Sequence, residues 1–227
     1  MFFLYMPENG FLLVNKPTTW TSHDVVGYLR KVTHIKKIGH AGTLDPFASG
    51  LLLVAIGREH TKRLDEFKGL DKTYIATLRL GAVSDTFDST GVITPASDKD
   101  ILRTEVEEIL KNFVGEQSQI PPMYSAKKVN GKKLYKLARK GIEVERKPSL
   151  ITIYELKILD YTYPLLKLKI HCSTGTYIRT LAHDIGEKLG VGAYCEELER
   201  TNIGSFSGDN ALPIKDFSRD NWKNLLF

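Results

Sequence analysis

The sequence has little of what marks a disulfide-stabilised, zinc-binding or membrane-spanning protein. It contains 2 cysteines, Cys172 and Cys195, among 227 residues, so neither a disulfide framework nor a cysteine-based zinc site is expected. We expect both thiols to be buried and reduced. The apolar start has no basic flank and no small-residue cleavage site, and no run reaches the roughly 18 apolar residues that a membrane helix needs. These absences predict a cytoplasmic protein without a membrane segment.

What the chain does have is a sizeable apolar fraction and a surplus of positive charge. It is 42% hydrophobic and 26% charged, with a formal net charge of +5 and a sequence pI of about 9.0. The apolar residues suffice for a real core. A basic balance favours a polyanionic partner, nucleic acid above all, although a solvated basic enzyme surface would give the same composition.

Hydrophobic periodicity predicts an α+β chain. It indicates helices that begin after Thr21 or Ser22, and over 60–67, 104–113 and 176–189, together with strands over 11–14, 51–56, 74–80, 149–161 and 165–172. Residues 36–50 are rich in glycine and predict an ordered loop, and residues 84–100 predict turns. Hairpins outnumber βαβ units. We therefore expect one domain over 1–227, with a large mixed or antiparallel sheet flanked by helices and a short C-terminal tail over 207–227.

Residues 115–148 form a distinct segment that we expect to be a basic insertion. Seven of the fourteen residues from 127 to 140 are basic and none is acidic, and Asn130-Gly131 is a tight-turn signal. The basic residues are Lys127, Lys128, Lys132, Lys133, Lys136, Arg139 and Lys140. Such a cluster is typical of phosphate contacts, which position a nucleic acid without reading its sequence. The alternative is a solvated helix face.

The segment with the most chemical information is 39–50, Gly-His-Ala-Gly-Thr-Leu-Asp-Pro-Phe-Ala-Ser-Gly. Three glycines permit backbone conformations that side chains forbid, and one carboxylate, Asp45, stands before a proline and an apolar run. Catalytic groups are often placed on such fixed loops. Asp45 could equally cap its own backbone in a turn. The segment is not a phosphate-binding loop, since the Gly-Lys-Ser/Thr ending is missing.

The same segment closely resembles the catalytic motif of the bacterial tRNA pseudouridine-55 synthase family. Further motifs similar to those of this family follow one another in family order and cover roughly residues 10–206. They are 14–17 with 21–26, 72–74, 85–88 closed by Gly91, 121–127, 175–181, and 198–201 with 203–204. The resemblance implies a pseudouridine synthase fold and an enzyme that isomerises uridine to pseudouridine in the T loop of transfer RNA.

The resemblance also implies a role for each candidate site residue. Asp45 would be the catalytic carboxylate, whether it attacks the uracil ring, attacks the sugar carbon or stabilises charge. Arg179 would be the guanidinium that keeps it ionised. The other residues would bind the substrate or assist the chemistry. Tyr74 would stack on the base and help to remove its proton, and Leu198 and Tyr177 would form walls of the base pocket. Asp88 would lie near the cleft, and the residues that contact the RNA would be Lys16, His40, Lys127 and Lys128. By pattern alone, Tyr74 would be a core tyrosine, Leu198 helix core, Arg179 a surface residue at a helix start and Asp88 a turn former.

For the reaction itself, the resemblance implies base flipping of the target uridine and a T-arm stem-loop as partner, without cofactor or metal. We expect a monomer with no protein partner. Many family members carry a further C-terminal RNA-binding module. Here the sequence after the last motif leaves room for a short tail, so we expect most or all of that module to be missing.

Three alternatives compete with this assignment. An RNA-binding protein of the same fold without turnover would have the same surface, but it would be free to lose Asp45, Tyr74 and Arg179. A related synthase could act on a different RNA. A metal-dependent nucleic-acid hydrolase would need ligand spacing that His34, His40, Asp45 and His60 do not show.

Overall fold

The structure is a computed structural model that describes residues 8–125, 127–129 and 131–227, with Lys128 described by its backbone only. The chain folds into two compact units, Met1–Thr73 with Glu199–Phe227, and Tyr74–Leu198. The boundaries fall inside strands β4 (Lys72–Leu80) and β12 (Ala193–Ile203). Each of these two strands therefore contributes residues to both units.

The first unit is built on strands ordered β14-β1-β3-β12, with β2 paired to β3. Its other elements are β1 (Gly10–Lys16), α1 (Ser22–Thr33), β2 (Ile38–Ala41), β3 (Ser49–Ile56), α2 (Arg58–Lys62), α3 (Leu64–Lys68), β13 (Phe206–Ser207), β14 (Leu212–Pro213) and three short 3₁₀ turns, η1 (Gly208–Asn210), η2 (Ile214–Asp216) and η3 (Trp222–Leu225). β1 pairs antiparallel with β3, opposing Lys16 to Gly50, and β12 pairs parallel with β3, opposing Arg200 to Gly50. Gly50 of β3 is thus paired with β1 on one side and with β12 on the other.

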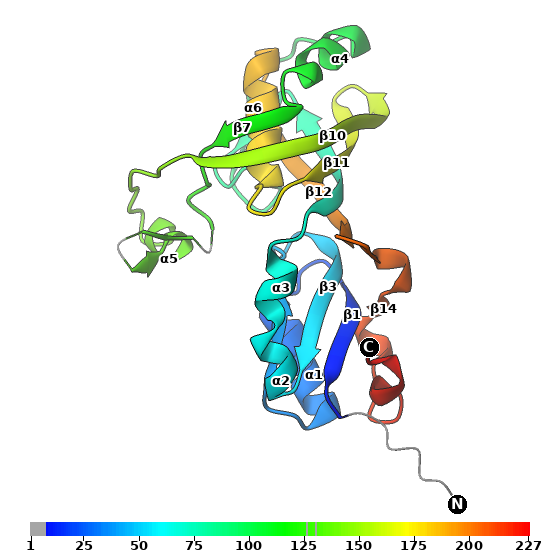
Figure 1. Cartoon of the computed structure of the whole chain (residues 1–227). Coiled ribbons are helices and arrows are strands. Elements are labelled where there is room, and N and C mark those ends of the chain that lie inside the picture. Colours follow the sequence, from blue (N-terminus) through cyan, green and yellow to red (C-terminus); the bar gives the residue numbers. More distant parts are fainter. Residues whose placement is uncertain (1–7, 126, 130) are drawn as a thin grey trace, which may run out of the picture. The chain divides into compact units, whose positions relative to one another are not determined.

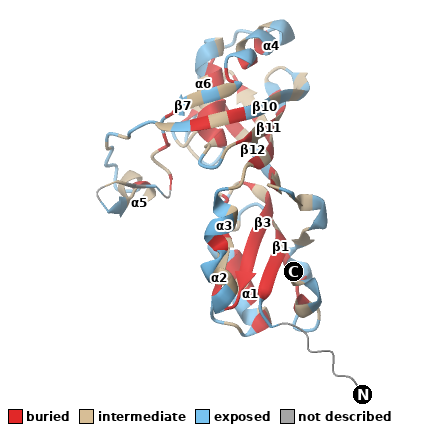
Figure 2. Cartoon of the chain, in the orientation of Figure 1, coloured by how far each residue is buried: buried red, intermediate tan, exposed pale blue. Residues whose placement is uncertain are grey.

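The C-terminal residues are part of the first unit's core. Ile214, Phe217 and Trp222 are buried in one cluster with apolar residues of β1, α1 and β3. Figure 2 shows β1 and β3 as almost continuously buried. Residues 207–227 were expected to form a short tail, and they instead help to close the apolar cluster on which α1 and β3 pack.

Helix α1 begins where its side chains satisfy its free backbone donors. Thr21 is the N-cap: its hydroxyl accepts from the Asp24 backbone N–H at 3.1 Å, and the Asp24 carboxylate accepts from the Thr21 N–H at 2.8 Å. This reciprocal arrangement is a capping box. Its buried face includes Val25, Val26 and Leu29, as the helical spacing predicts.

The second unit has strands in the order β12-β4-β11-β10-β7, with helices α4 and α6 beside them (Figure 1). Its elements are β5 (Ala82–Ser84), β6 (Ile93–Pro95), α4 (Arg103–Lys111), β7 (Gly115–Gln119), β8 (Lys128–Val129), β9 (Lys132–Lys133), α5 (Leu134–Ala138), β10 (Ser149–Thr162), β11 (Leu165–Cys172) and α6 (Ile178–Leu189). The first five residues of the predicted insertion form the edge strand β7, so the segment outside the main sheet is 120–148. Within it, β8 pairs with β9, while Asn130 of the predicted turn lies outside the described residues.

The α+β class and the large mixed sheet are confirmed, since ten strands pair both parallel and antiparallel. Four local expectations differ from the structure. The loop expected over 36–50 contains β2, the turns over 84–100 contain β6, and residues 60–67 fall in two helices. Leu198, which would be helix core by pattern, lies in strand β12. At Gly39 the strand β2 packs closely on α3, since a Cβ there would lie 2.7 Å from Leu64 Cδ1.

Candidate active site

The loop that carries Asp45 joins β2 to β3 and is fixed on both sides of the carboxylate. Leu44 and Ala48 are buried, whereas Asp45 is half-buried. The buried hydroxyl of Ser22 accepts from the Leu44 N–H at 3.0 Å and donates to the Leu44 carbonyl at 3.3 Å. The Thr19 N–H donates to the Pro46 carbonyl at 2.7 Å. The backbone around Asp45 is therefore held, while its side chain keeps access to solvent.

Arg200 is a second anchor of this loop, and sequence reasoning did not single it out. Its side chain is 2% exposed, and its guanidinium donates to the carbonyls of Leu51 at 2.8 Å and Gly42 at 3.1 Å. Gly50 has φ +99°, and a Cβ there would lie 2.4 Å from the Arg200 carbonyl oxygen. The available signal was the place of Arg200 inside the last family-like motif, Leu198-Glu199-Arg200-Thr201.

Lys16 is fully buried, which differs from the RNA-facing loop position that we expected. Its ammonium donates to the carbonyls of Pro17 at 2.8 Å and Trp20 at 2.7 Å. Burial lowers the pKa of Lys16 to about 8, and the negative charge of Asp45 opposes that shift while the positive charge of Arg200 adds to it. The side chain stabilises the turn after β1 and contributes positive charge near Asp45.

His40 lies on β2, at the start of the Asp45 loop. Its ring packs edge-on against His23 with centroids 5.8 Å apart. Burial, followed by the charges of His23, Arg200 and Lys68, lowers the pKa of His40 to about 4. The imidazole is therefore neutral at physiological pH.

In the second unit, Arg179 is the second residue of α6 and is almost completely buried. Its Nη1 lies 3.2 Å from Asp88 Oδ2 and donates to the Thr86 carbonyl at 3.0 Å, and its Nη2 donates to the Tyr124 carbonyl at 2.8 Å. The two charged side chains are 4% and 5% exposed. An arginine at a positive helix end is unfavourable by itself, so the carboxylate and the two carbonyls stabilise it there.

Asp88 is held as firmly as the arginine it contacts. Its Oδ1 accepts from the Thr86 hydroxyl at 2.8 Å, from the Thr90 N–H at 2.9 Å and from the Thr90 hydroxyl at 2.6 Å. The neighbouring Phe87 has φ +63° and stacks on His183 with centroids 4.1 Å apart. Asp88 therefore forms the turn, as its pattern predicts, and also pairs with Arg179.

The remaining candidates of the second unit lie on separate elements. Tyr74 on β4 is 9% exposed and Leu198 on β12 is 8% exposed. Tyr177 is the N-cap of α6 and is partly exposed. Lys127 is exposed, and its ammonium donates to the Ser149 hydroxyl at 2.6 Å, while the side chain of Lys128 is outside the described part of the chain. The structure thus groups Tyr74, Asp88, Tyr177, Arg179 and Leu198 in the second unit, and Lys16, His40 and Asp45 in the first.

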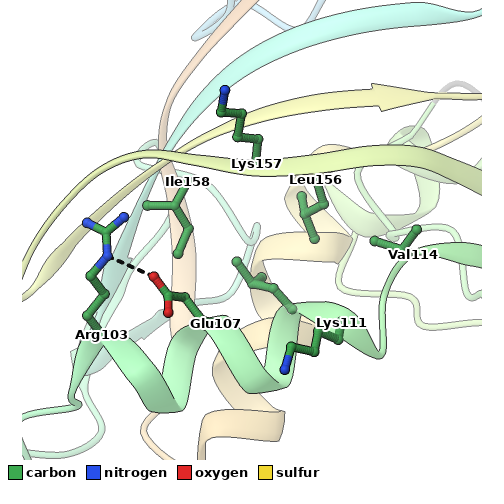
Figure 3. Close-up of a pocket in the computed structure, with 8 residues that line it drawn as sticks. Arg103, Glu107, Lys111, Val114, Leu156, Lys157 and Ile158 are labelled. Carbon is green, nitrogen blue, oxygen red and sulfur yellow. Dashed lines mark hydrogen bonds and ion pairs between the residues drawn. The ribbon is translucent and has the colours of Figure 1, made fainter.

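An open groove of about 330 Å³ lies elsewhere on the second unit. Figure 3 shows it between α4 and β10, where Arg103 Nε lies 2.9 Å from Glu107 Oε1 and apolar side chains of β10 form the opposite wall. None of the candidate site residues lines it. Across 8–125, 127–129 and 131–227, we find no group of three or more His, Cys, Asp or Glu side chains placed to hold a metal ion. No helix among these residues has the length and apolar character to cross a membrane.

Comparison with known families places these residues in context. Residues 30–178 match the N-terminal domain of the TruB family of pseudouridylate synthases. Residues 179–225 match a C-terminal domain of tRNA pseudouridylate synthase B, so the short tail expected over 207–227 lies within a short C-terminal domain of the family. That match begins at Arg179 and includes Arg200.

Curated relatives agree over most of the chain. A protein of Clostridium tetani named tRNA pseudouridine synthase B is 47% identical over 219 residues, which cover 96% of this chain and 75% of the relative. A protein of Chlamydia abortus with the same name is 49% identical over 205 residues, covering 90% of this chain and 87% of the relative.

Solved structures show the same fold. A chain from a Cbf5-Nop10-Gar1 complex matches with a TM-score of 0.72 and 29% identity over 91% of this chain. A chain from an H/ACA RNP bound to a substrate RNA that contains 2'-deoxyuridine matches with a TM-score of 0.71 and 27% identity over 96% of this chain. The present chain spans only 53% and 55% of the length of these two chains.

Proposed function

The chain belongs to the TruB family of pseudouridylate synthases, which makes it an isomerase, and we propose that it converts one uridine in the T loop of transfer RNA, at position 55, to pseudouridine. The relatives named tRNA pseudouridine synthase B support transfer RNA as the substrate. The observation that carries the assignment is the Asp45 loop, a half-buried carboxylate on a backbone fixed by Ser22 and Arg200. We take residues 1–227 as the catalytic domain.

In this proposal Asp45 is the catalytic carboxylate. The reaction breaks the N-glycosidic bond, turns the uracil and rejoins it through carbon. A carboxylate can take part as a nucleophile toward the ring or the sugar, or as a fixed negative charge. Each role needs an ionised Asp45 in a defined position. The loop contacts meet the positional requirement, and the positive charge of the buried Lys16 favours the negative charge of Asp45.

Arg179 is proposed as a further catalytic residue that acts on the target uridine, with Asp88 holding the guanidinium in place. Arg179 contacts one carboxylate and two carbonyls, so its planar fork has a fixed orientation. Tyr74 is proposed to stack on the target base, and Leu198 and Tyr177 to wall its pocket. His40 would occupy the space that the uridine leaves when it is flipped out of its stack.

The exposed lysines of the insertion are proposed to contact phosphates. Lys127, Lys132 and Lys136 are exposed, as phosphate-binding side chains must be. We expect them to bind the T-arm without reading its sequence. We also propose that the protein is a cytoplasmic monomer and that it needs neither cofactor nor metal.

The test is to incubate the protein with unmodified tRNA and map pseudouridine along the molecule. We expect a single modified uridine in the T loop, formed without added cofactor and in the presence of EDTA. An isolated T-arm stem-loop should be modified at a rate within about tenfold of whole tRNA, which corresponds to roughly 1.4 kcal/mol of transition-state binding from the rest of the molecule. Modification at other positions, or none, would contradict the proposal.

A further inference from the structure

Gln119, the last residue of β7, is a buried amide whose polar atoms both contact one other residue. Its side chain is 4% exposed. Its Oε1 accepts from the Tyr177 backbone N–H at 2.8 Å, and its Nε2 donates to the Tyr177 carbonyl at 3.0 Å. This two-point contact spans 58 positions in the sequence. It links the end of a strand to the N-terminus of α6.

The residue that Gln119 holds is the N-cap of the helix that carries Arg179. Tyr177 has extended backbone angles, and no side chain caps the helix there. Its carbonyl also accepts the first helical bond, from the Leu181 N–H at 3.1 Å. The first turn of a helix lacks internal partners for its N–H groups and frays readily. Contact from outside the helix therefore limits motion of the turn that positions Arg179.

A second contact joins the same short segment to α6. The Tyr124 carbonyl, five residues after Gln119, accepts from Arg179 Nη2 at 2.8 Å. Segment 119–124 thus touches the start of α6 at both of its ends, and it leads directly into the basic residues of the insertion. Gln119 is the end of this segment that is anchored in the sheet, because Ser149 of β10 pairs with it.

We infer that Gln119 is a positioning residue: its amide fixes the first turn of α6, and thereby orients the Arg179 guanidinium for reaction. The inference rests on the proposed role of Arg179. Gln119→Met keeps the length of the side chain and removes both hydrogen bonds. A displacement of a catalytic group by about 1 Å can lower the rate about a hundredfold. We expect Gln119→Met to lower the single-turnover rate at saturating tRNA by about tenfold to a hundredfold, with the Kd for tRNA changed less than about threefold.

Gln119→Glu supplies a readout that a purely structural role would not move. A protonated carboxyl can accept from the Tyr177 N–H and donate to the Tyr177 carbonyl, as the amide does. An ionised carboxylate cannot donate, and it would face that carbonyl with a negative charge. The rate of Gln119→Glu relative to wild type should therefore rise as the pH falls from about 8 toward about 6, because burial raises the pKa of a carboxyl into this range. The neighbouring charged groups are the same in both proteins: Arg179 with its partner Asp88, and the exposed Glu116 of β7. The ratio of the two rates therefore reports the ionisation of the new carboxyl alone.

Matched controls come from Gln117, two residues earlier on the same strand. Its Nε2 donates to the carbonyl of Asn112, the C-cap of α4, at 3.1 Å. Gln117→Met and Gln117→Glu should keep wild-type rates within about twofold, with a rate ratio that does not change with pH.

The outcomes separate the two proposals. If the wild-type protein forms no pseudouridine, the proposed function fails. If it does and Gln119→Met matches it, or if weaker tRNA binding explains the whole loss, only the positioning role fails. A Gln119→Glu ratio that stays flat with pH would also overturn it. Circular dichroism and thermal unfolding show whether Gln119→Met is folded. If it is not, the pH ratio of Gln119→Glu decides alone.

Discussion

The Asp45 loop and the basic segment 120–148 are held in different ways. The loop is tied by side chains and backbone from distant parts of the first unit, including Ser22 of α1 and Arg200 of β12. Backbone bonds of the insertion run largely between its own residues, as from the Leu134 N–H to the Lys127 carbonyl at 2.8 Å. Its basic residues are mostly exposed. A group that does chemistry needs a fixed position, whereas phosphate contacts tolerate side chains that adapt.

The contrast predicts that changes in the loop affect the rate, whereas changes in the insertion affect tRNA binding. The largest effect is expected for Asp45→Asn, which keeps the shape of the side chain and removes its charge. Turnover should fall below detection while the Kd for tRNA stays within a few fold. The measurement is single-turnover pseudouridine formation beside a binding titration. A variant that retains an appreciable fraction of the wild-type rate would refute the role of Asp45.

The next largest effect is expected for Arg200→Lys. One ammonium cannot reproduce the planar fork that bonds the carbonyls of Leu51 and Gly42, so the Asp45 loop should loosen. We expect the single-turnover rate to fall by about tenfold to a hundredfold, with little change in tRNA binding. Arg63→Lys is the control, because Arg63 is an exposed arginine of the same unit that is paired with Glu66. Equal effects from both variants would remove the special role of Arg200.

Tyr74→Phe tests whether the hydroxyl takes part in the chemistry. The phenylalanine ring can still stack, so binding should persist while the rate of the chemical step falls by about tenfold or more, a modest share of what general acid-base groups contribute. Tyr74→Leu should weaken both. A Tyr74→Phe protein with the wild-type single-turnover rate would leave Tyr74 as a stacking surface only.

Substitutions in the insertion should change tRNA binding and leave the rate of the chemical step nearly unchanged. Replacing four lysines of the insertion together by Gln should flatten the salt dependence of tRNA binding, by about 0.7 to 0.9 in slope for each phosphate that is no longer neutralised. The four residues are Lys127, Lys128, Lys132 and Lys133. The single-turnover rate at saturation should hardly change. The control replaces four exposed lysines of the same unit outside the insertion, Lys111, Lys157, Lys167 and Lys188. If both quadruple variants flatten the slope equally, total charge rather than the insertion governs binding.

The smallest expected effect concerns stability and Lys16. Burial gives this lysine a folded-state pKa of about 8, below its ordinary 10.5. Between these values the unfolded chain holds the proton and the folded chain releases it, so stability rises with pH by at most about 1.4 kcal/mol per unit. Below about pH 8 both states are protonated and the slope from this group vanishes. Urea unfolding from pH 7 to 9.5 should show this rise in the wild-type protein relative to Lys16→Met, and parallel curves would contradict it.

By itself, the sequence determined the elements whose periodicity is local. The helix after Thr21, the apolar run Leu51 to Ile56 and the alternation from Tyr74 to Leu80 all appear as predicted, because burial of one face follows directly from residue spacing. The motif order likewise identified the family and Asp45 as a candidate. These conclusions need no knowledge of which segments meet in space.

Tertiary structure alone decided which charged residues are buried and what they contact. Lys16 and Arg200 look like surface residues in a sequence. Both are nevertheless buried, because backbone carbonyls from their own or other segments accept hydrogen bonds from their side chains. Leu198 would be helix core by pattern, and it lies instead in β12, whose Glu199 and Arg200 pair parallel with Ser49 and Gly50 of β3. Gln119 gains its importance only from Tyr177. Hydrogen bonds between distant segments offset the cost of burying polar groups, and no local pattern records them.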